Sequence, residues 1–188
     1  MHDLTPITAL GGTAPRVDTV ADVTLTEVPD VALASVAARL GKETACARNL
    51  ETLLGAAAPA PGRATTGKDY AALWMGPDQW MLSADFRTHE DIAALVKSTL
   101  TDTASVTEQT DAWTCFDLTG PRINAVLELL CNIDLTQCGT GDATRTSIHH
   151  LGCFVTCTDA GQSVRIFGPR ASAGSLHHAI TTAMAAAL

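Results

Sequence analysis

The chain has 188 residues, 46% of them hydrophobic and 17% charged, which is enough apolar material for a buried core and too little charge for a disordered chain. Its net charge is −8 and its 12 basic residues are scattered, so a nucleic-acid-binding surface is not expected. No segment approaches the roughly 18 consecutive apolar residues of a membrane-spanning helix. The N-terminus shows no signal-peptide pattern either, and these features together predict a cytoplasmic protein.

The predicted organisation is a short tail followed by one folded domain. Residues 1–21 have no apolar periodicity and contain several Pro and Gly residues, which predicts an extended N-terminal tail. Residues 22–188 are predicted to form a single α+β domain made of two halves, at about 22–105 and 106–188.

The first half is predicted to open with a strand and two helices. Residues 22–28 alternate apolar and polar side chains, as a half-buried strand does. The apolar residues of 33–40 fall at helical spacing, and a second helical pattern over 46–54 ends at Gly55. The Pro- and Ala-rich stretch 56–67 is predicted to be a loop, either a linker or a cover over a partner surface.

Gly-Pro follows an apolar run at three places, 76–77, 120–121 and 168–169. Glycine permits a sharp bend and proline fixes the next φ, so the dipeptide is typical of a strand that reverses or enters a helix. The first copy predicts a hairpin, and the other two predict strand-to-helix junctions. After the hairpin, Thr88 is predicted to cap a helix whose buried side spans 92–100.

The second half is predicted to repeat this order of strands and helices. Between its two helices, which are expected to begin at Pro121 and Pro169, lie three candidate strands. Hairpins join antiparallel strands, so two ferredoxin-like halves with helices on one face of each sheet are expected. The extended segments are 104–120, 144–150, 153–159 and 162–168.

One cluster has metal-ligand chemistry, namely His149, His150, Cys153 and Cys157. On one strand the two cysteines would lie about 13 Å apart, too far to share an ion without a turn. Core thiols are therefore the favoured interpretation, with a small metal-binding module left as an alternative. The sequence predicts no catalytic, cofactor-binding or metal-binding residue in this chain.

Other polar and aromatic residues are candidates for contact with partner proteins. Arginine beside a hydroxyl residue at a strand end can clamp a carboxylate or can form an internal ion pair. Two tryptophans flank the first Gly-Pro turn and suit either the core or an interface. Two histidines of the last helix are expected at the surface or an interface. The partner-interface candidates are Arg145, Thr146, Arg170, Ser172, Trp74 and Trp80, and the histidines are His177 and His178.

Several blocks, in order, resemble the γ subunit of heterotetrameric sarcosine oxidase, in the superfamily of the folate-binding glycine-cleavage T protein. They cover nearly the whole chain beyond the tail. The blocks are LTEVPDVALASVAARLGKETA (25–45), LWMGPDQWMLSA (73–84), EQTDAWTCFDLTGPRINAVLELLCNIDL (108–135), RTSIHHLG (145–152) and GPRASAGSLHHAI (168–180).

The resemblance implies a T-protein-like folate-binding domain in a four-subunit oxidoreductase. Such an enzyme demethylates sarcosine oxidatively and passes the one-carbon unit to tetrahydrofolate. The resemblance implies α, β and δ subunits as partners, with FAD, FMN, NAD, tetrahydrofolate and zinc on those chains. It implies a structural, non-catalytic role for the γ subunit. A stand-alone folate-binding aminomethyltransferase-like protein is the alternative.

Overall fold

A computed structural model describes residues 6–188, so residues 1–5 of the predicted tail lie outside the described part of the chain. The described chain divides into two compact units. The six-stranded unit holds the described residues up to Pro29, Ala112–Thr140 and Arg145–Leu188. The five-stranded unit holds Asp30–Asp111 and Gly141–Thr144.

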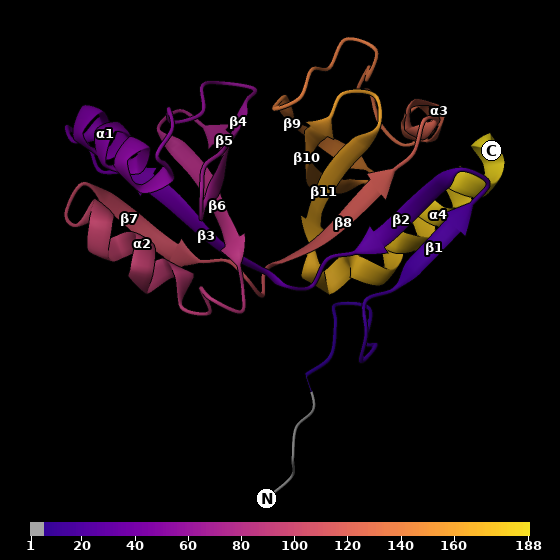
Figure 1. The fold of residues 1–188 in the computed structure, drawn as a ribbon, viewed down its shortest axis with the longest axis horizontal. Helices are drawn as coiled ribbons and strands as arrows, with labels where there is room; N and C mark the ends of the chain where they lie inside the picture. Colours follow the sequence, from indigo (N-terminus) through magenta and orange to yellow (C-terminus); the bar gives the residue numbers. More distant parts are fainter. Residues whose placement is uncertain (1–5) are drawn as a thin grey trace, which may run out of the picture. The chain divides into compact units, whose positions relative to one another are not determined.

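The six-stranded unit is an antiparallel sheet with two helices, and its strand order is β1-β2-β8-β11-β10-β9 (Figure 1). A short 3-10 turn, η1, precedes the last helix. The elements are β1 Val17–Val20, β2 Val23–Glu27, β8 Trp113–Thr119, α3 Ile123–Glu128, β9 Ala143–Ile148, β10 Leu151–Asp159, β11 Ser163–Pro169, η1 Arg170–Ser172 and α4 Ala173–Ala187.

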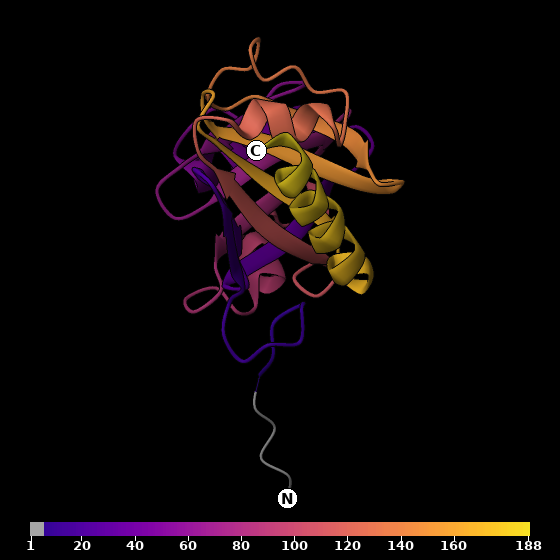
Figure 2. The ribbon, with the colours of Figure 1, turned by 90° about the vertical axis from the view of Figure 1, so that its right-hand side faces the viewer.

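The core of this unit lies between the sheet and its helices. Leu25, Leu118 and Val164 stand opposite one another on three neighbouring strands, and all three are fully or almost fully buried. Helices α3 and α4 lie across this face of the sheet (Figure 2) and contribute Leu127 and Ile180 to the same cluster. Alternate strand residues thus bury one face, which is the pattern of an antiparallel sheet covered on one side.

The five-stranded unit repeats the plan with strand order β4-β5-β6-β3-β7. Val36 and Trp80 face each other across β3 and β6, and they pack with Leu50 and Val96 of the two helices. The elements are β3 Val31–Ala38, α1 Glu43–Leu54, β4 Ala64–Thr66, β5 Ala71–Gly76, β6 Gln79–Asp85, α2 Ile92–Leu100 and β7 Ala104–Glu108.

The predicted fold class is confirmed, because each unit is an antiparallel sheet carrying helices. The predicted hairpin at 76–79 joins β5 to β6, and the three predicted strands of the second half are β9, β10 and β11. Gly55 ends α1 in the left-handed conformation, as expected of a helix C-cap. Among residues 6–188, no helix is long and apolar enough to cross a lipid bilayer.

Close packing accounts for the glycine at two of the three Gly-Pro steps. A Cβ on Gly120, whose φ is +135°, would lie 2.2 Å from the carbonyl oxygen of Asp22. A Cβ on Gly168 would lie 2.3 Å from Cδ2 of Leu176 in α4. Gly76 has open space around it, so its glycine is not required by contact. The repeated dipeptide is therefore a structural feature at 120–121 and 168–169.

The helix predicted over 33–40 is wrong, because these residues form most of β3 and the turn after it. β3 lies inside the sheet, between β6 and β7, and Val31–Ala34 are all buried. A strand buried on both faces carries apolar residues consecutively, so helical spacing can be found in it by chance.

The predicted boundaries also need correction. Residues 17–20 of the predicted tail form β1, which pairs with β2, and residues 64–66 of the predicted loop form β4. The predicted division near residue 105 placed the strand predicted at 22–28, which is β2 in the structure, in the first half. In the structure β2 pairs with β8, which places the N-terminal strands in the same sheet as the C-terminal half. Strand pairing over long sequence separation is not visible in local patterns.

The predicted cap of α2 is wrong as well. The Thr88 hydroxyl donates to the carbonyl oxygen of Asp85, which belongs to the preceding turn. Asp91 holds the N-cap position and makes no capping hydrogen bond through its side chain. Of the predicted buried stripe, Ile92, Val96 and Leu100 are buried, whereas Leu95 is 43% exposed.

Candidate functional site

Arg145 lies on β9, an edge strand of the six-stranded sheet. Its guanidinium carbon is 5.7 Å from the centroid of the Phe154 ring on the neighbouring strand β10. A cation over an aromatic face at this distance is held by the quadrupole of the ring. The exposed Arg145 side chain is therefore oriented by an aromatic neighbour rather than by a carboxylate.

A hollow of about 530 Å³ lies beside this arginine, lined by Asn132, Arg145, Thr146 and Ser147. The Thr146 hydroxyl donates to Oδ1 of Asn132 over 3.1 Å. This contact joins β9 to the segment after α3 and orients the Asn132 amide. The predicted pair of Arg145 and Thr146 is thus brought into one polar hollow, whereas Asn132 and Ser147 were not predicted.

His149 and His150 form the turn between β9 and β10, and both have positive φ, 49° and 66°. Two consecutive left-handed residues are typical of a type I′ turn, which favours Asn and Gly. The two rings lie 5.9 Å apart and both residues are exposed. Two histidines therefore occupy turn positions that favour other residues, at the end of the strand that carries Arg145.

The thiols of the predicted cluster point into packed surroundings. Cys153 is fully buried and Cys157 is 4% exposed, and burial raises the pKa of the Cys153 thiol to about 11. Within residues 6–188, no group of three or more His, Cys, Asp or Glu side chains is placed to hold one metal ion. Cys115 is buried on β8 in the same way, and burial raises its pKa to about 12.

The second predicted arginine pair lies in a different element. Arg170 begins η1, and its backbone N–H donates to the carbonyl oxygen of Ala112 over 3.0 Å. Ser172 holds the N-cap position of α4 without a side-chain capping bond. Arg170 and Ser172 therefore stand at the β11–α4 junction, whereas Arg145 and Thr146 stand on the edge strand β9.

The predicted tryptophans face each other across a hairpin. Trp74 of β5 is opposite Trp80 of β6 in the strand register. Trp80 is 6% exposed, belongs to the core of the five-stranded unit and donates its indole N–H to the carbonyl oxygen of Pro59 over 3.0 Å. Trp74 is half-buried. Trp80 therefore anchors the Pro- and Ala-rich loop to the sheet, and an interface role for Trp74 remains a prediction.

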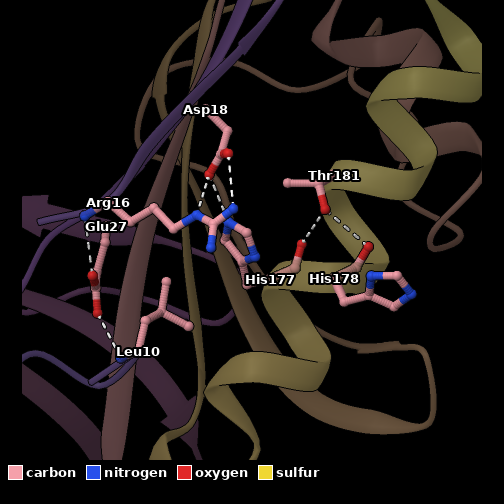
Figure 3. A network of polar contacts seen from close by, with 7 residues as sticks. All are labelled: Leu10, Arg16, Asp18, Glu27, His177, His178 and Thr181. Atoms are coloured by element: carbon pink, nitrogen blue, oxygen red, sulfur yellow. Dashed lines mark hydrogen bonds and ion pairs between the residues drawn. The ribbon is translucent and has the colours of Figure 1, made fainter. Parts of the chain in front are cut away.

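A polar network that the sequence analysis missed joins the N-terminal strand to the last helix (Figure 3). Nε2 of His177 lies 2.7 Å from Oδ2 of Asp18, and Arg16 donates Nε to the same oxygen over 2.9 Å. The hydrogen bond from Arg16, followed by that from His177, lowers the pKa of Asp18. His177 was predicted at the surface or an interface, but it is 8% exposed. Its carboxylate partner is 159 residues away in sequence, so local patterns could not show the contact.

A second carboxylate, Glu27, holds the chain segment before β1. Its Oε1 accepts from the backbone N–H of Leu10 over 3.0 Å, and its Oε2 accepts from that of Arg16 over 3.2 Å (Figure 3). Glu27 is only 3% exposed. A buried carboxylate needs such partners, so this residue fixes residues 10–16 against the sheet.

A third missed feature is the ion pair of Arg165 and Asp117. The two residues are directly opposite on β11 and β8 and form two parallel hydrogen bonds of 2.7 and 2.8 Å. Their side chains are 30% and 26% exposed, and the bond to Asp117 raises the pKa of Arg165. The sequence does show one charged residue within each of these apolar strands. Only the strand register shows that the two side chains meet.

Solved structures provide the comparison with known proteins. The chain is similar to a chain of a heterotetrameric sarcosine oxidase. The match, to the Corynebacterium sp. U-96 enzyme in complex with pyrrole 2-carboxylate, has a TM-score of 0.71 and 25% identity. It covers 87% of this chain and 84% of that chain. The predicted resemblance to this complex is therefore confirmed. No protein-family model and no curated protein sequence matches the chain.

A glycine cleavage system aminomethyltransferase T from Bartonella henselae has the same fold over a shorter part of its length. This match has a TM-score of 0.62 and 14% identity, and it covers 85% of the present chain. The present chain spans only 45% of the aminomethyltransferase. The T-protein-like fold predicted from the sequence is thus found in the structure, where it matches less than half of the aminomethyltransferase.

Proposed function

We propose that this chain is the γ-type, non-catalytic subunit of a heterotetrameric sarcosine oxidase. The observation that carries the proposal is the extent of the structural match, which covers 87% of this chain and 84% of a chain of that enzyme. Because the shared fold spans most of both chains, this chain is suited to the position that the matched chain holds in its enzyme. Its role is to hold the other subunits together while they carry out the oxidative demethylation.

The cofactors belong to the partner chains in this proposal. FAD, FMN and NAD serve the oxidation, tetrahydrofolate accepts the one-carbon unit, and zinc lies in another subunit. The α, β and δ subunits are the proposed partners, and the cytoplasm is the proposed location.

The stand-alone aminomethyltransferase alternative has less support. The present chain spans 45% of the aminomethyltransferase that it resembles, so more than half of that protein has no counterpart here. A protein acting alone would have to complete its site within a much shorter chain.

Purification of the tagged chain from its own host tests the proposal. The expected product is a yellow complex with flavin absorbance, further subunits on a denaturing gel and sarcosine-dependent oxygen consumption. A colourless monomer that binds tetrahydrofolate in calorimetry would contradict the proposal and favour the alternative. Another N-methyl amino acid as the preferred substrate would keep the subunit role and change only the substrate.

A further inference from the structure

Among residues 6–188, Arg145 forms no ion pair with a carboxylate. The ion pairs found among residues 6–188 do not include it, although acidic residues outnumber basic ones by 20 to 12. In an acidic protein, a guanidinium left without such a partner remains available to a carboxylate from outside. Basic residues of the described chain that do form pairs with aspartates include Arg16, Lys42, Arg63, Arg87, Arg122 and Arg165.

The side chain is already oriented for a ligand. Phe154 is 4% exposed, so its ring is fixed by packing, and Arg145 lies over it at 5.7 Å. A guanidinium stacked on an immobile ring loses less rotamer entropy on binding, and its planar donors match a carboxylate. Lysine shares the charge but not this geometry.

The walls of the hollow add neutral donors and acceptors around the cation. Thr146 donates to Oδ1 of Asn132, so the amide N–H groups of Asn132 take no part in this bond. Ser147 contributes a hydroxyl two residues from Arg145 on the same strand. The hollow of about 530 Å³ is open to solvent, so a carboxylate on a protein segment can enter it.

The position of the hollow favours a protein segment as its occupant. β9 is the last strand of its sheet, and an edge strand offers backbone donors and acceptors to an added chain. The strained His149–His150 turn keeps two further imidazoles at the end of this strand.

We propose that the hollow of Asn132, Arg145, Thr146 and Ser147 is a docking site for an acidic side chain of a partner subunit. Arg145 holds the Asp or Glu carboxylate, and the amide and hydroxyl groups bind its remaining oxygen lone pairs. This inference rests on the proposed function, because the segment that carries the carboxylate belongs to another chain of the complex.

Co-purification of the complex with matched variants tests the site. Arg145→Ala is compared with Arg48→Ala, an exposed arginine on α1 that also forms no ion pair within residues 6–188. We expect Arg145→Ala to weaken retention of the partner chains by about 30-fold or more, which corresponds to roughly 2 kcal/mol. Arg48→Ala should assemble like the wild type, and the melting temperature of the isolated chain should change in neither variant.

A zero-length crosslink identifies the occupant. In the Arg145→Lys variant, a carbodiimide should join the introduced amine to a partner carboxylate, and mass spectrometry of the peptides would show which one. Added acetate at 100 mM distinguishes a free carboxylate from a protein segment, since it should not release the partner chains.

The possible outcomes separate the two proposals. If the wild-type chain yields no complex, both the proposed function and this site are wrong. If the complex forms and Arg145→Ala retains its partners like Arg48→Ala, the site is wrong and the proposed function stands. A crosslink from position 145 only within this chain would also overturn the site, as would release of the partners by acetate.

Discussion

The two units share a plan and differ in what they bury. Of the buried polar residues found in the described chain, Thr103 lies in the five-stranded unit, and the others lie in the six-stranded unit. The core of the five-stranded unit is aliphatic apart from Trp80 and Cys46. The polar residues buried in the six-stranded unit are Thr8, Glu27, Thr114, Thr156 and His177.

Backbone strain is also distributed unequally. Three non-glycine residues with positive φ lie in the six-stranded unit, and two lie in the five-stranded unit. Buried polar groups stabilise only when their partners are in place, and strained turns persist only where packing imposes them. Single substitutions and pH should therefore affect the six-stranded unit more. The residues with positive φ are Ala21, His149 and His150 in the six-stranded unit, and Asp78 and Thr101 in the five-stranded unit.

The largest difference is expected from the two arginine pairs. Arg165→Met leaves Asp117 partly buried without its partner, and we expect a loss of about 2 kcal/mol in the free energy of unfolding. Arg87→Met breaks the pair with Asp30, where the side chains are 74% and 47% exposed, and should have no measurable effect. Urea denaturation with hydrogen-exchange mass spectrometry assigns each change to its unit. Equal losses would remove the contrast between the units.

The hairpin turns are expected to show the next largest effect, in the opposite direction. Changing His149→Asn together with His150→Gly supplies residues that a type I′ turn favours, and should stabilise the six-stranded unit by about 1–2 kcal/mol. Asp78→Gly relieves one left-handed aspartate, φ 55°, in the β5–β6 turn and should add only a few tenths of a kcal/mol. Thermal melts measure both gains. No stabilisation by the double change would show that the histidine turn is not strained.

Glu27 and Glu108 form a third matched pair, since each carboxylate accepts two backbone N–H groups. Glu27→Gln weakens two buried hydrogen bonds and should cost about 1 kcal/mol, with faster hydrogen exchange at Leu10 and Arg16. Glu108→Gln alters exposed bonds to Ala93 and Thr110 and should change little. Faster exchange only near Glu108 would contradict the proposed difference.

Asp18 should produce the smallest effect, visible as a pH dependence. Its pKa is lowered in the folded chain by Arg16 and His177. The folded state thus binds the proton less readily, and the stabilisation is complete above the ordinary aspartate pKa of about 3.9. It is lost as the pH falls through the lower folded value. Asp18→Asn should be less stable than the wild type at pH 7, and the difference should shrink toward pH 3.

Asp102 provides the control for this experiment. Lys42 lowers its pKa too, but its side chain is 71% exposed, so screening leaves a smaller effect of Asp102→Asn. Denaturation curves at pH 7 and pH 3 give both comparisons. A difference for Asp18→Asn that grows toward low pH would show that its protonated form is the one stabilised.

Local patterns in the sequence predicted the elements whose information is local. Apolar periodicity identified α1 and α4, and Gly-Pro marked the β5–β6 hairpin and two strand-to-helix junctions. The predicted helix starts at Pro121 and Pro169 were too early, because α3 begins at Ile123 and α4 at Ala173. The resemblance to heterotetrameric sarcosine oxidase rested on residue blocks, and the structural match is to a chain of such an enzyme. The strand β3 was missed because burial on both faces removes the period of two on which strand recognition depends.

The sequence by itself therefore determined the fold class, most of the elements and the likeness to a subunit of a larger enzyme. Only the tertiary structure decided that β1 and β2 join the sheet of the C-terminal half, because pairing of β2 with β8 spans about 90 residues. It also decided which charges meet: His177 with Asp18, Arg165 with Asp117, and Arg145 with no carboxylate of the described chain. Such contacts depend on strand register and helix packing, which bring together residues whose separation in sequence carries no periodic signal.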